Sequence, residues 1–312
     1  MRNGIVMAIV FSLLATAFAI LLALPANTVK PTGMTYVATI QPVAAILQEI
    51  VRGRAEVLRL LPPNASPHTY EFTPADAAKA QNAFALVYVG ENLDQVWAEK
   101  LGAKNKIKLL DLVPNEYRLP NADIEEGEPT PVNVPQGARL PNEMTDAHFW
   151  TDPLTVRAVV PGLVNELCRL DKEGEAIYRA NAEKFMALLD SLHRQALDIL
   201  SPVAGKPVFL FHPSFQYLIK RYGLMMEQAV EPSPGKNPTG NDIVNIIEAI
   251  HKTGAKAIFT EPQLPKMYAQ AIARDAGVKI YELDPEGIGG GRGTYSDFLL
   301  YNVNVLREAL GQ

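Results

Sequence analysis

Short apolar runs alternate with amphipathic segments along most of this chain. The runs of the first half, rich in β-branched residues, predict strands at 34–40, 55–61, 84–90 and 107–113. The runs of the second half predict strands at 207–211, 226–230, 256–260 and 279–283. Helical segments separate many of these runs, such as residues 43–52 and the terminal segment 295–310. Such alternation is typical of parallel sheets covered by helices, so we expect an α/β fold.

A long helical segment separates the two halves. Apolar residues recur at helical spacing from Phe185 to Leu200, and residues 172–200 contain no proline and no glycine after Gly174. We therefore predict two lobes, each with a roughly four-stranded parallel sheet. Their expected boundaries are 34–170 for the N-terminal lobe, 171–200 for the connecting helix and 201–312 for the C-terminal lobe.

The N-terminus has a different pattern. Residues 5–24 are apolar or small and uncharged, and twenty residues form a helix about 30 Å long, enough to cross a bilayer. Arg2 on the short side predicts that the body of the protein is exported. Small residues at Ala17–Ala19 and Leu24–Ala26 would suit signal cleavage, but the run is longer than a usual signal peptide core. We expect residues 1–33 to be an uncleaved anchor or a signal peptide, followed by a linker.

Residues 114–147 interrupt the alternation. They are rich in proline, asparagine and acids, and predict a long surface loop whose charges are solvated. The whole chain has a net charge of −5 and no long basic run, which argues against a nucleic-acid partner. Cys168 is the only cysteine, so no intramolecular disulfide can form, and its apolar helical surroundings predict a buried thiol.

Several polar residues follow predicted strands directly. His68 lies in the loop after the second strand, and His212, Glu261 and Asp284 each come immediately after a strand of the second half. Functional groups of open parallel sheets gather beyond the carboxyl ends of the strands. These four residues are therefore candidates for a common site.

The five histidines of the chain fall into two groups. Three occupy proline-rich corners, His68 in SPHTY, His148 in AHFWTDP and His212 in FHPSF, whereas His193 and His251 lie inside helical segments. Three imidazoles and one carboxylate are a tetrahedral zinc set. Proline restricts the backbone, and ligands held in place lose less entropy on binding. The prolines around His68 thus have a physical reason if that histidine binds a metal.

Five successive blocks carry a family resemblance. They are LPPNASPHTYEFTPAD, DAHFWTDP, VFLFHPSFQYLIKRYGL, EPSPGKNPTGNDIVNIIEAIHKTGAKAIFTEPQ and the C-terminal ELDPEG followed by TYSDFLLYNVNVLREAL. Together, from about Met34 to the C-terminus, they resemble the zinc/manganese solute-binding proteins of ABC transporters (family 9, cluster A-I). This resemblance implies two α/β lobes, a rigid connecting helix and one metal in the cleft between the lobes.

The motifs of that family match this chain at His68, His148, His212 and Asp284, which the resemblance implies as the metal ligands. Asn64 stands where the family usually has glycine, and asparagine tolerates the left-handed conformation that such a turn needs. No histidine-rich insertion is present between residues 114 and 147. The glycine run 289–293 lacks the ending of a phosphate loop and predicts a flexible connection.

The leading hypothesis is an exported protein, not an enzyme, that captures a divalent metal and delivers it to an ABC permease. Imidazole at position 212 favours Zn²⁺, with Mn²⁺ as the alternative, because manganese relatives tend to have a carboxylate there. We expect a monomer on the extracytoplasmic side of the membrane. Two other hypotheses remain open at this point: a zinc hydrolase with Asp284 or Glu261 as general base, although the chain has no HExxH motif, and a metal-containing surface adhesin.

Overall fold

The computed structural model describes residues 33–121, 139–227, 229–231, 235 and 237–312. The predicted anchor or signal peptide at 5–24 lies outside these residues. Within the part of the chain that is described, no helix is long and apolar enough to cross a membrane.

The first half of the chain folds around a four-stranded parallel sheet, as predicted. Its strands run in the order β2-β1-β3-β4. Their bounds are β1 Thr35–Ala38, β2 Glu56–Arg59, β3 Ala85–Tyr88 and β4 Lys106–Lys108. The sheet is accompanied by α2 (Gln41–Val51), α3 (Pro74–Asn82) and the single turn α4 (Gln95–Ala98). All four residues of β3 are buried, because helices cover both faces of a parallel sheet.

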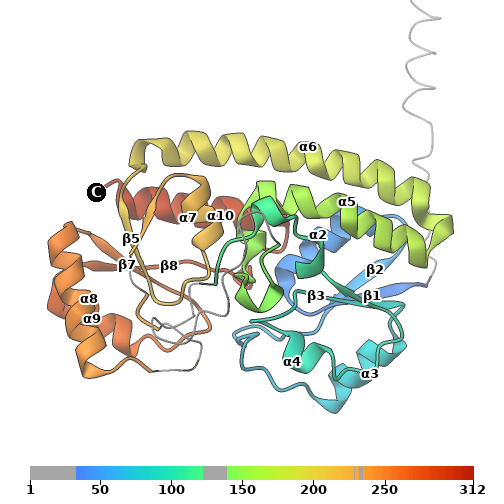
Figure 1. The fold of residues 1–312 in the computed structure, drawn as a ribbon, viewed down its shortest axis with the longest axis horizontal. Helices are drawn as coiled ribbons and strands as arrows, with labels where there is room; N and C mark the ends of the chain where they lie inside the picture. The colour runs from blue at the N-terminus through green and yellow to red at the C-terminus, as the bar shows by residue number, and fades with distance from the viewer. Residues whose placement is uncertain (1–32, 122–138, 228, 232–234, 236) are drawn as a thin grey trace, which may run out of the picture.

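The second half repeats this arrangement. Its parallel strands run in the order β6-β5-β7-β8. Their bounds are β5 Pro207–Leu210, β6 Met225–Met226, β7 Ala257–Thr260 and β8 Lys279–Glu282. Its shorter helices are α7 (Gln216–Arg221), α8 (Gly240–Thr253) and α9 (Met267–Ala276). Figure 1 shows the two sheets in separate lobes, with α8 and α9 on the outer side of the second lobe.

Three longer helices lie together along one side of the lobes. They are α5 (Pro153–Leu170), α6 (Glu175–Leu200) and α10 (Tyr295–Leu310). Figure 1 shows α6 lying across both lobes, above α5 at one end and α10 at the other. Its buried face includes Phe185, Leu189, Leu192 and Leu200, which continue one helical stripe along the whole length. Because this stripe is packed from end to end, α6 is the rigid connection that the sequence pattern predicts.

Every strand is shorter than its predicted range, and two strands differ from the prediction most. β4 ends at Lys108 because the chain turns into a 3₁₀ segment at Leu110–Leu112. β6 starts at Met225 and contains two residues, so the prediction of a strand over 226–230 was wrong in its extent. The other short 3₁₀ segments are Asn115–Tyr117, Asn142–Met144, Phe149–Thr151, Lys172–Gly174 and Ser201–Val203.

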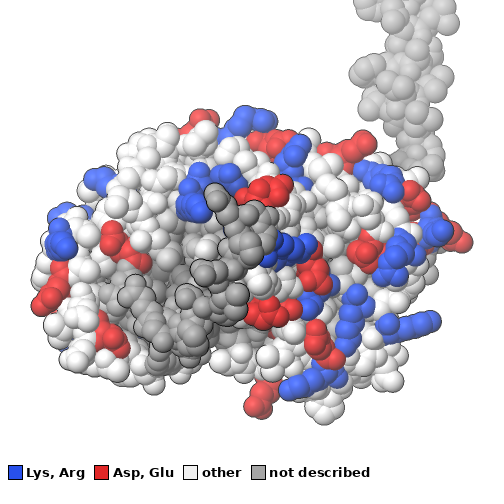
Figure 2. Space-filling view, viewed as in Figure 1, with Lys and Arg blue, Asp and Glu red and all other residues white. Residues whose placement is uncertain are grey.

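Local signals for the ends of helices are confirmed. Thr73 caps α3 in a capping box with Asp76, Asp152 caps α5, and Thr294 caps α10. Asn64 adopts a φ of 64°, the left-handed conformation expected of it. Figure 2 shows positive and negative side chains interspersed over the face in view, most densely on the first lobe.

Candidate metal centre

His68 lies on a loop of the first lobe that a hydrogen bond restrains next to the histidine. The loop leaves β2, turns at Asn64 and leads into α3. The indole Nε1 of Trp97 donates a hydrogen bond of 2.8 Å to the carbonyl of Pro67, the residue before the histidine. The proline ring and this buried hydrogen bond together restrict the backbone that carries His68.

Asp146 holds His148 through both its ring and its backbone. It directly precedes the 3₁₀ turn Phe149–Thr151 that leads to the cap of α5. Its Nδ1 lies 2.8 Å from Oδ1 of Asp146, and its backbone N–H donates to the same oxygen at 2.9 Å. Because a carboxylate oxygen accepts, Nδ1 carries the proton and the lone pair of Nε2 points the other way. A carboxylate behind a histidine is a common arrangement at metal sites, because it fixes the tautomer and raises the basicity of the ligand.

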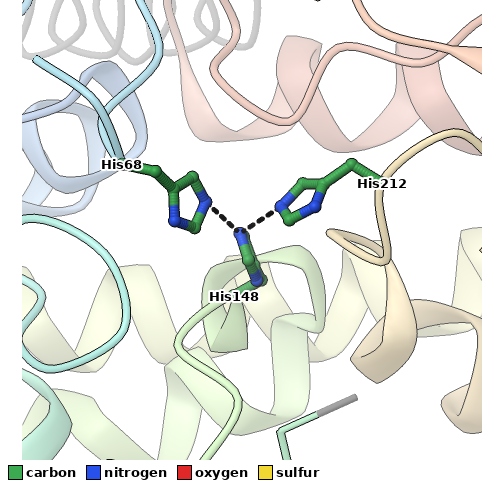
Figure 3. A group of neighbouring side chains, drawn as sticks. All are labelled: His68, His148 and His212. Carbon is green, nitrogen blue, oxygen red and sulfur yellow. Dashed lines mark hydrogen bonds between the residues drawn. The ribbon is translucent and has the colours of Figure 1, made fainter. Parts of the chain in front are cut away.

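His212 comes from the second lobe. It follows β5 after one further residue and is buried, with 4% of its surface exposed. Figure 3 shows the three rings meeting from three separate segments of the chain. The Nε2 atom of His148 lies 3.3 Å from Nε2 of His68 and 3.4 Å from Nε2 of His212.

These separations are compatible with a bound zinc ion. Two ligands of a tetrahedral zinc with Zn–N bonds of 2.0–2.1 Å lie about 3.3–3.4 Å apart. The three histidines form a group whose ligand atoms all lie within 4.8 Å of one another. The imidazoles of the described chain are therefore already spaced as the ligands of a single Zn²⁺ would be.

Burial keeps two of these imidazoles neutral. Desolvation, followed by repulsion from the neighbouring rings, lowers the pKa of His68 and of His212 well below 6.5. A hydrogen bond with the backbone of Asn92 opposes this shift at His68, but to a smaller extent. Neutral imidazole is the form that binds a metal, so at pH 7 the site has few protons to displace.

The two lobes contact each other around His148. Arg221 of α7 makes an ion pair of 2.6 Å with Asp152, the residue that caps α5. The hydroxyl of Tyr217, also on α7, donates to the carbonyl of Asp146 at 3.0 Å. Trp150 donates through Nε1 to the carbonyl of Pro285 at 2.9 Å. The segment that carries His148 is thus held by both lobes.

The structure does not bring Asp284 into the histidine group. Its side chain is fully buried beyond the end of β8, but its Oδ2 accepts hydrogen bonds from Nη1 of Arg292 and from the N–H of Gly289. Its other oxygen, Oδ1, is buried and has no hydrogen-bond partner among the described residues. The glycine run 289–293 is therefore more than the flexible connection we predicted, because it folds back onto this carboxylate.

Two other carboxyl groups line the small cavity beside the histidines. Glu261 was a candidate from its place after β7, but sequence reasoning missed Glu286. The same rule on strand ends could have found Glu286, since it follows β8 by four residues. Burial raises the pKa of Glu261 to about 8 and that of Glu286 well above 4.5. Oε2 of Glu286 is buried without a hydrogen-bond partner among the described residues.

The cavity that these residues enclose is very small. It measures about 10 Å³ and is lined by the three histidines, Glu261, Glu286 and their neighbours. That space is about what one water molecule occupies. A larger, open groove of about 590 Å³ lies on the other side of His68 and is lined by Glu91, Glu99 and Glu143 among others. The buried cavity can hold a single ion but no organic substrate.

Comparisons with known proteins agree with this geometry. Residues 37–309 match a family model described as zinc-uptake complex component A, periplasmic (ZnuA). A high-affinity zinc uptake system protein ZnuA of Paracoccus denitrificans is 29% identical over 93% of this chain and 94% of its own length. A putative metal-binding protein of Thermotoga maritima is 28% identical over 89% of this chain and 93% of its own length.

Solved structures of similar chains have the same fold. A crystal structure of ZnuA superposes with a TM-score of 0.75 at 25% identity, covering 89% of this chain and 99% of that one. A laminin-binding protein of Streptococcus agalactiae, described as bifunctional with adhesin and metal-transporting activity, superposes with a TM-score of 0.71 at 25% identity. It covers 89% of this chain and the whole of its own.

Proposed function

The chain belongs to the family of periplasmic zinc-uptake components A, and from this membership we propose that it captures Zn²⁺ and delivers it to an ABC permease. Such proteins are solute-binding parts of transport systems and not enzymes. The observation that carries the proposal is the convergence of three imidazole nitrogens, at 3.3 and 3.4 Å, in a buried cavity between two lobes.

The proposed ligands are His68, His148, His212 and Asp284. We assign the fourth bond to Oδ1 of Asp284, because that oxygen is buried and has no hydrogen-bond partner among the described residues. Because Asp284 lies outside the group that the three histidines form, this bond requires Asp284 and the histidines to approach each other when the ion binds. Glu286, which lines the cavity already, is the competing carboxylate.

Zinc fits this donor set better than manganese. Imidazole suits zinc, whereas carboxylate and water oxygens suit manganese. Three nitrogen ligands spaced for bonds of 2.0–2.1 Å leave room for one oxygen ligand in a tetrahedral arrangement. The prediction of Zn²⁺ over Mn²⁺, made from imidazole at position 212, agrees with the zinc-binding relatives.

A permease in the membrane is the proposed partner, and the chain would act as a monomer on the extracytoplasmic side. We retain residues 5–24 as the segment that exports the chain or anchors it. An anchored chain would remain near the permease, because a tether raises the effective concentration of one partner at the other.

The geometry disfavours a hydrolase. Both oxygens of Glu261 accept hydrogen bonds, from Ser214 at 2.6 Å and from Gln263 at 2.6 Å, so this carboxyl is poorly placed to act as a general base. The cavity beside the histidines also has no room for an organic substrate. The laminin-binding relative is described as an adhesin, and no feature of the described residues assigns this chain that second role.

A titration tests the proposed function. The segment from about Lys30 to the C-terminus should bind one Zn²⁺ per chain and keep its circular dichroism spectrum after a chelator removes the metal. Each lobe has its own sheet, and one hydrophobic cluster runs through both lobes, so packed side chains already join the lobes and the ion is not needed to fold them. Loss of most of the helical signal on chelation would show a structural metal and contradict a transport role.

A further inference from the structure

The carboxylate of Asp284 is held by a dedicated set of contacts. Oδ2 accepts from Nη1 of Arg292 at 2.6 Å and from the N–H of Gly289 at 3.1 Å. The backbone of Asp284 is fixed as well, since its N–H donates to Oδ1 of Asn302 and its carbonyl accepts from Nδ2 of the same residue. This carboxylate therefore has several defined contacts, and Arg292 is its charged partner among the described residues.

The position of Arg292 is equally well defined. Its guanidinium lies over the ring of Tyr301, with Cζ 3.6 Å from the ring centroid, and its side chain is 18% exposed. Such a cation–π contact with a partly desolvated guanidinium adds to the ion pair. Gly289 makes room for it, because a Cβ at that position would collide with the guanidinium. The absence of a side chain at Gly289 thus allows Arg292 to contact Asp284.

This contact limits what Asp284 can offer to a metal. With Oδ2 occupied by Arg292, only Oδ1 is available, so the carboxylate can bind through one oxygen but not through both. The guanidinium also offsets the negative charge of the ligand. Tetrahedral zinc needs one further oxygen beside three imidazoles, whereas manganese prefers sites with more oxygen ligands.

We propose that Arg292 is a specificity-determining residue, which restricts Asp284 to a single coordinating oxygen and so favours zinc over manganese. The inference rests on the proposed function, because it takes Asp284 as the fourth ligand. It goes beyond that function in assigning metal selectivity to a residue that does not touch the metal.

The test compares the affinities of Arg292→Gln and wild-type protein for Zn²⁺ and Mn²⁺, by competition with chelators at one pH. The neutral side chain removes the charged partner of Oδ2, which then keeps only the hydrogen bond from Gly289, and we expect the preference for zinc over manganese to fall by at least roughly tenfold, as for other residues behind metal ligands. Gly289→Ala, which keeps the arginine but displaces it, should shift the preference in the same direction. Thermal unfolding of each variant checks that it is folded.

Arg274→Gln is the matched control, because Arg274 is exposed on α9 and pairs only with its neighbour Asp275 among the described residues. Its metal preference should equal that of the wild type. An unchanged or increased preference for zinc in folded Arg292→Gln and Gly289→Ala would overturn the inference, while wild-type zinc binding and the proposed function would stand. If the variant His148→Ala bound zinc as tightly as the wild type, the proposed function itself would fail.

Discussion

Replacing His148 by alanine is expected to weaken zinc binding by more than about 100-fold, because loss of an outer partner of a ligand already costs 10–100-fold. His148 is central to the group, since its Nε2 is the atom that lies within 3.4 Å of the other two imidazoles. It is also the best-oriented ligand, held through Nδ1 by Asp146. Isothermal titration with Zn²⁺, by competition where binding is tight, measures the loss.

A graded series makes this result specific. His68→Ala and His212→Ala should each cost roughly tenfold or more, since each removes one metal bond. Asp146→Asn, which disturbs the tautomer of His148 but keeps all three imidazoles, should cost about 10–100-fold and so less than His148→Ala. His193→Ala is the control. His193 lies on α6, where its ring stacks on Tyr222, and the variant should bind zinc normally. Equal losses in all variants would refute the assignment of the site.

Zinc affinity is expected to fall steeply at acid pH, but at a lower pH than the pKa of free histidine would suggest. Burial holds the pKa values of His68 and His212 well below 6.5, so between pH 8 and about 6.5 these ligands carry no proton to displace. Below their pKa values each imidazole binds a proton that zinc must remove. The logarithm of the affinity should then fall with a slope that approaches three per pH unit.

The same shifts affect the stability of the metal-free protein. A histidine whose pKa is lower in the folded state favours unfolding when it becomes protonated, because the unfolded chain binds the proton more tightly. Its contribution to stability is therefore fully present above about pH 6.5, and it is lost as pH falls toward the lowered pKa values.

Zinc affinity by competition with a chelator, corrected for the protonation of the chelator, measures the profile. Glu261→Gln is a useful companion, because the pKa of Glu261 is raised to about 8 and its titration would add a gentle slope near neutrality. A profile that stays flat at every acid pH at which both proteins remain folded would mean that the three histidines are not the ligands.

Much of the fold could be predicted from local patterns. The two sheets follow from short apolar runs, and the ends of helices follow from single residues such as Thr73 and Asp152. The places of His68 and His212, each beyond the carboxyl end of a strand of its own sheet, follow from the rule on strand ends, whereas their meeting across the two lobes was implied by the family resemblance. These features depend on a few neighbouring residues, which is why the sequence alone indicates them.

The environment of Asp284 could not be predicted in this way. Its place after β8 is visible in the sequence, but the direction of its side chain depends on how the glycine run folds back to bring Arg292 to Oδ2. Glu286 reaches the cavity because of the turn at Gly287, whose φ of 61° is not visible in a hydrophobic pattern. The extent of β6 could not be predicted either, since the strand consists of the two residues that pair with β5.

X-ray absorption spectroscopy at the zinc edge, on protein loaded with one equivalent of Zn²⁺, tests the central claim most directly. The structure predicts four-coordinate zinc with three imidazole nitrogens at about 2.0–2.1 Å and one carboxylate oxygen. The outer-shell scattering of imidazole rings distinguishes histidine from other ligands. A shell of six oxygens, or a fit with fewer than two imidazoles, would contradict a zinc site built from His68, His148 and His212.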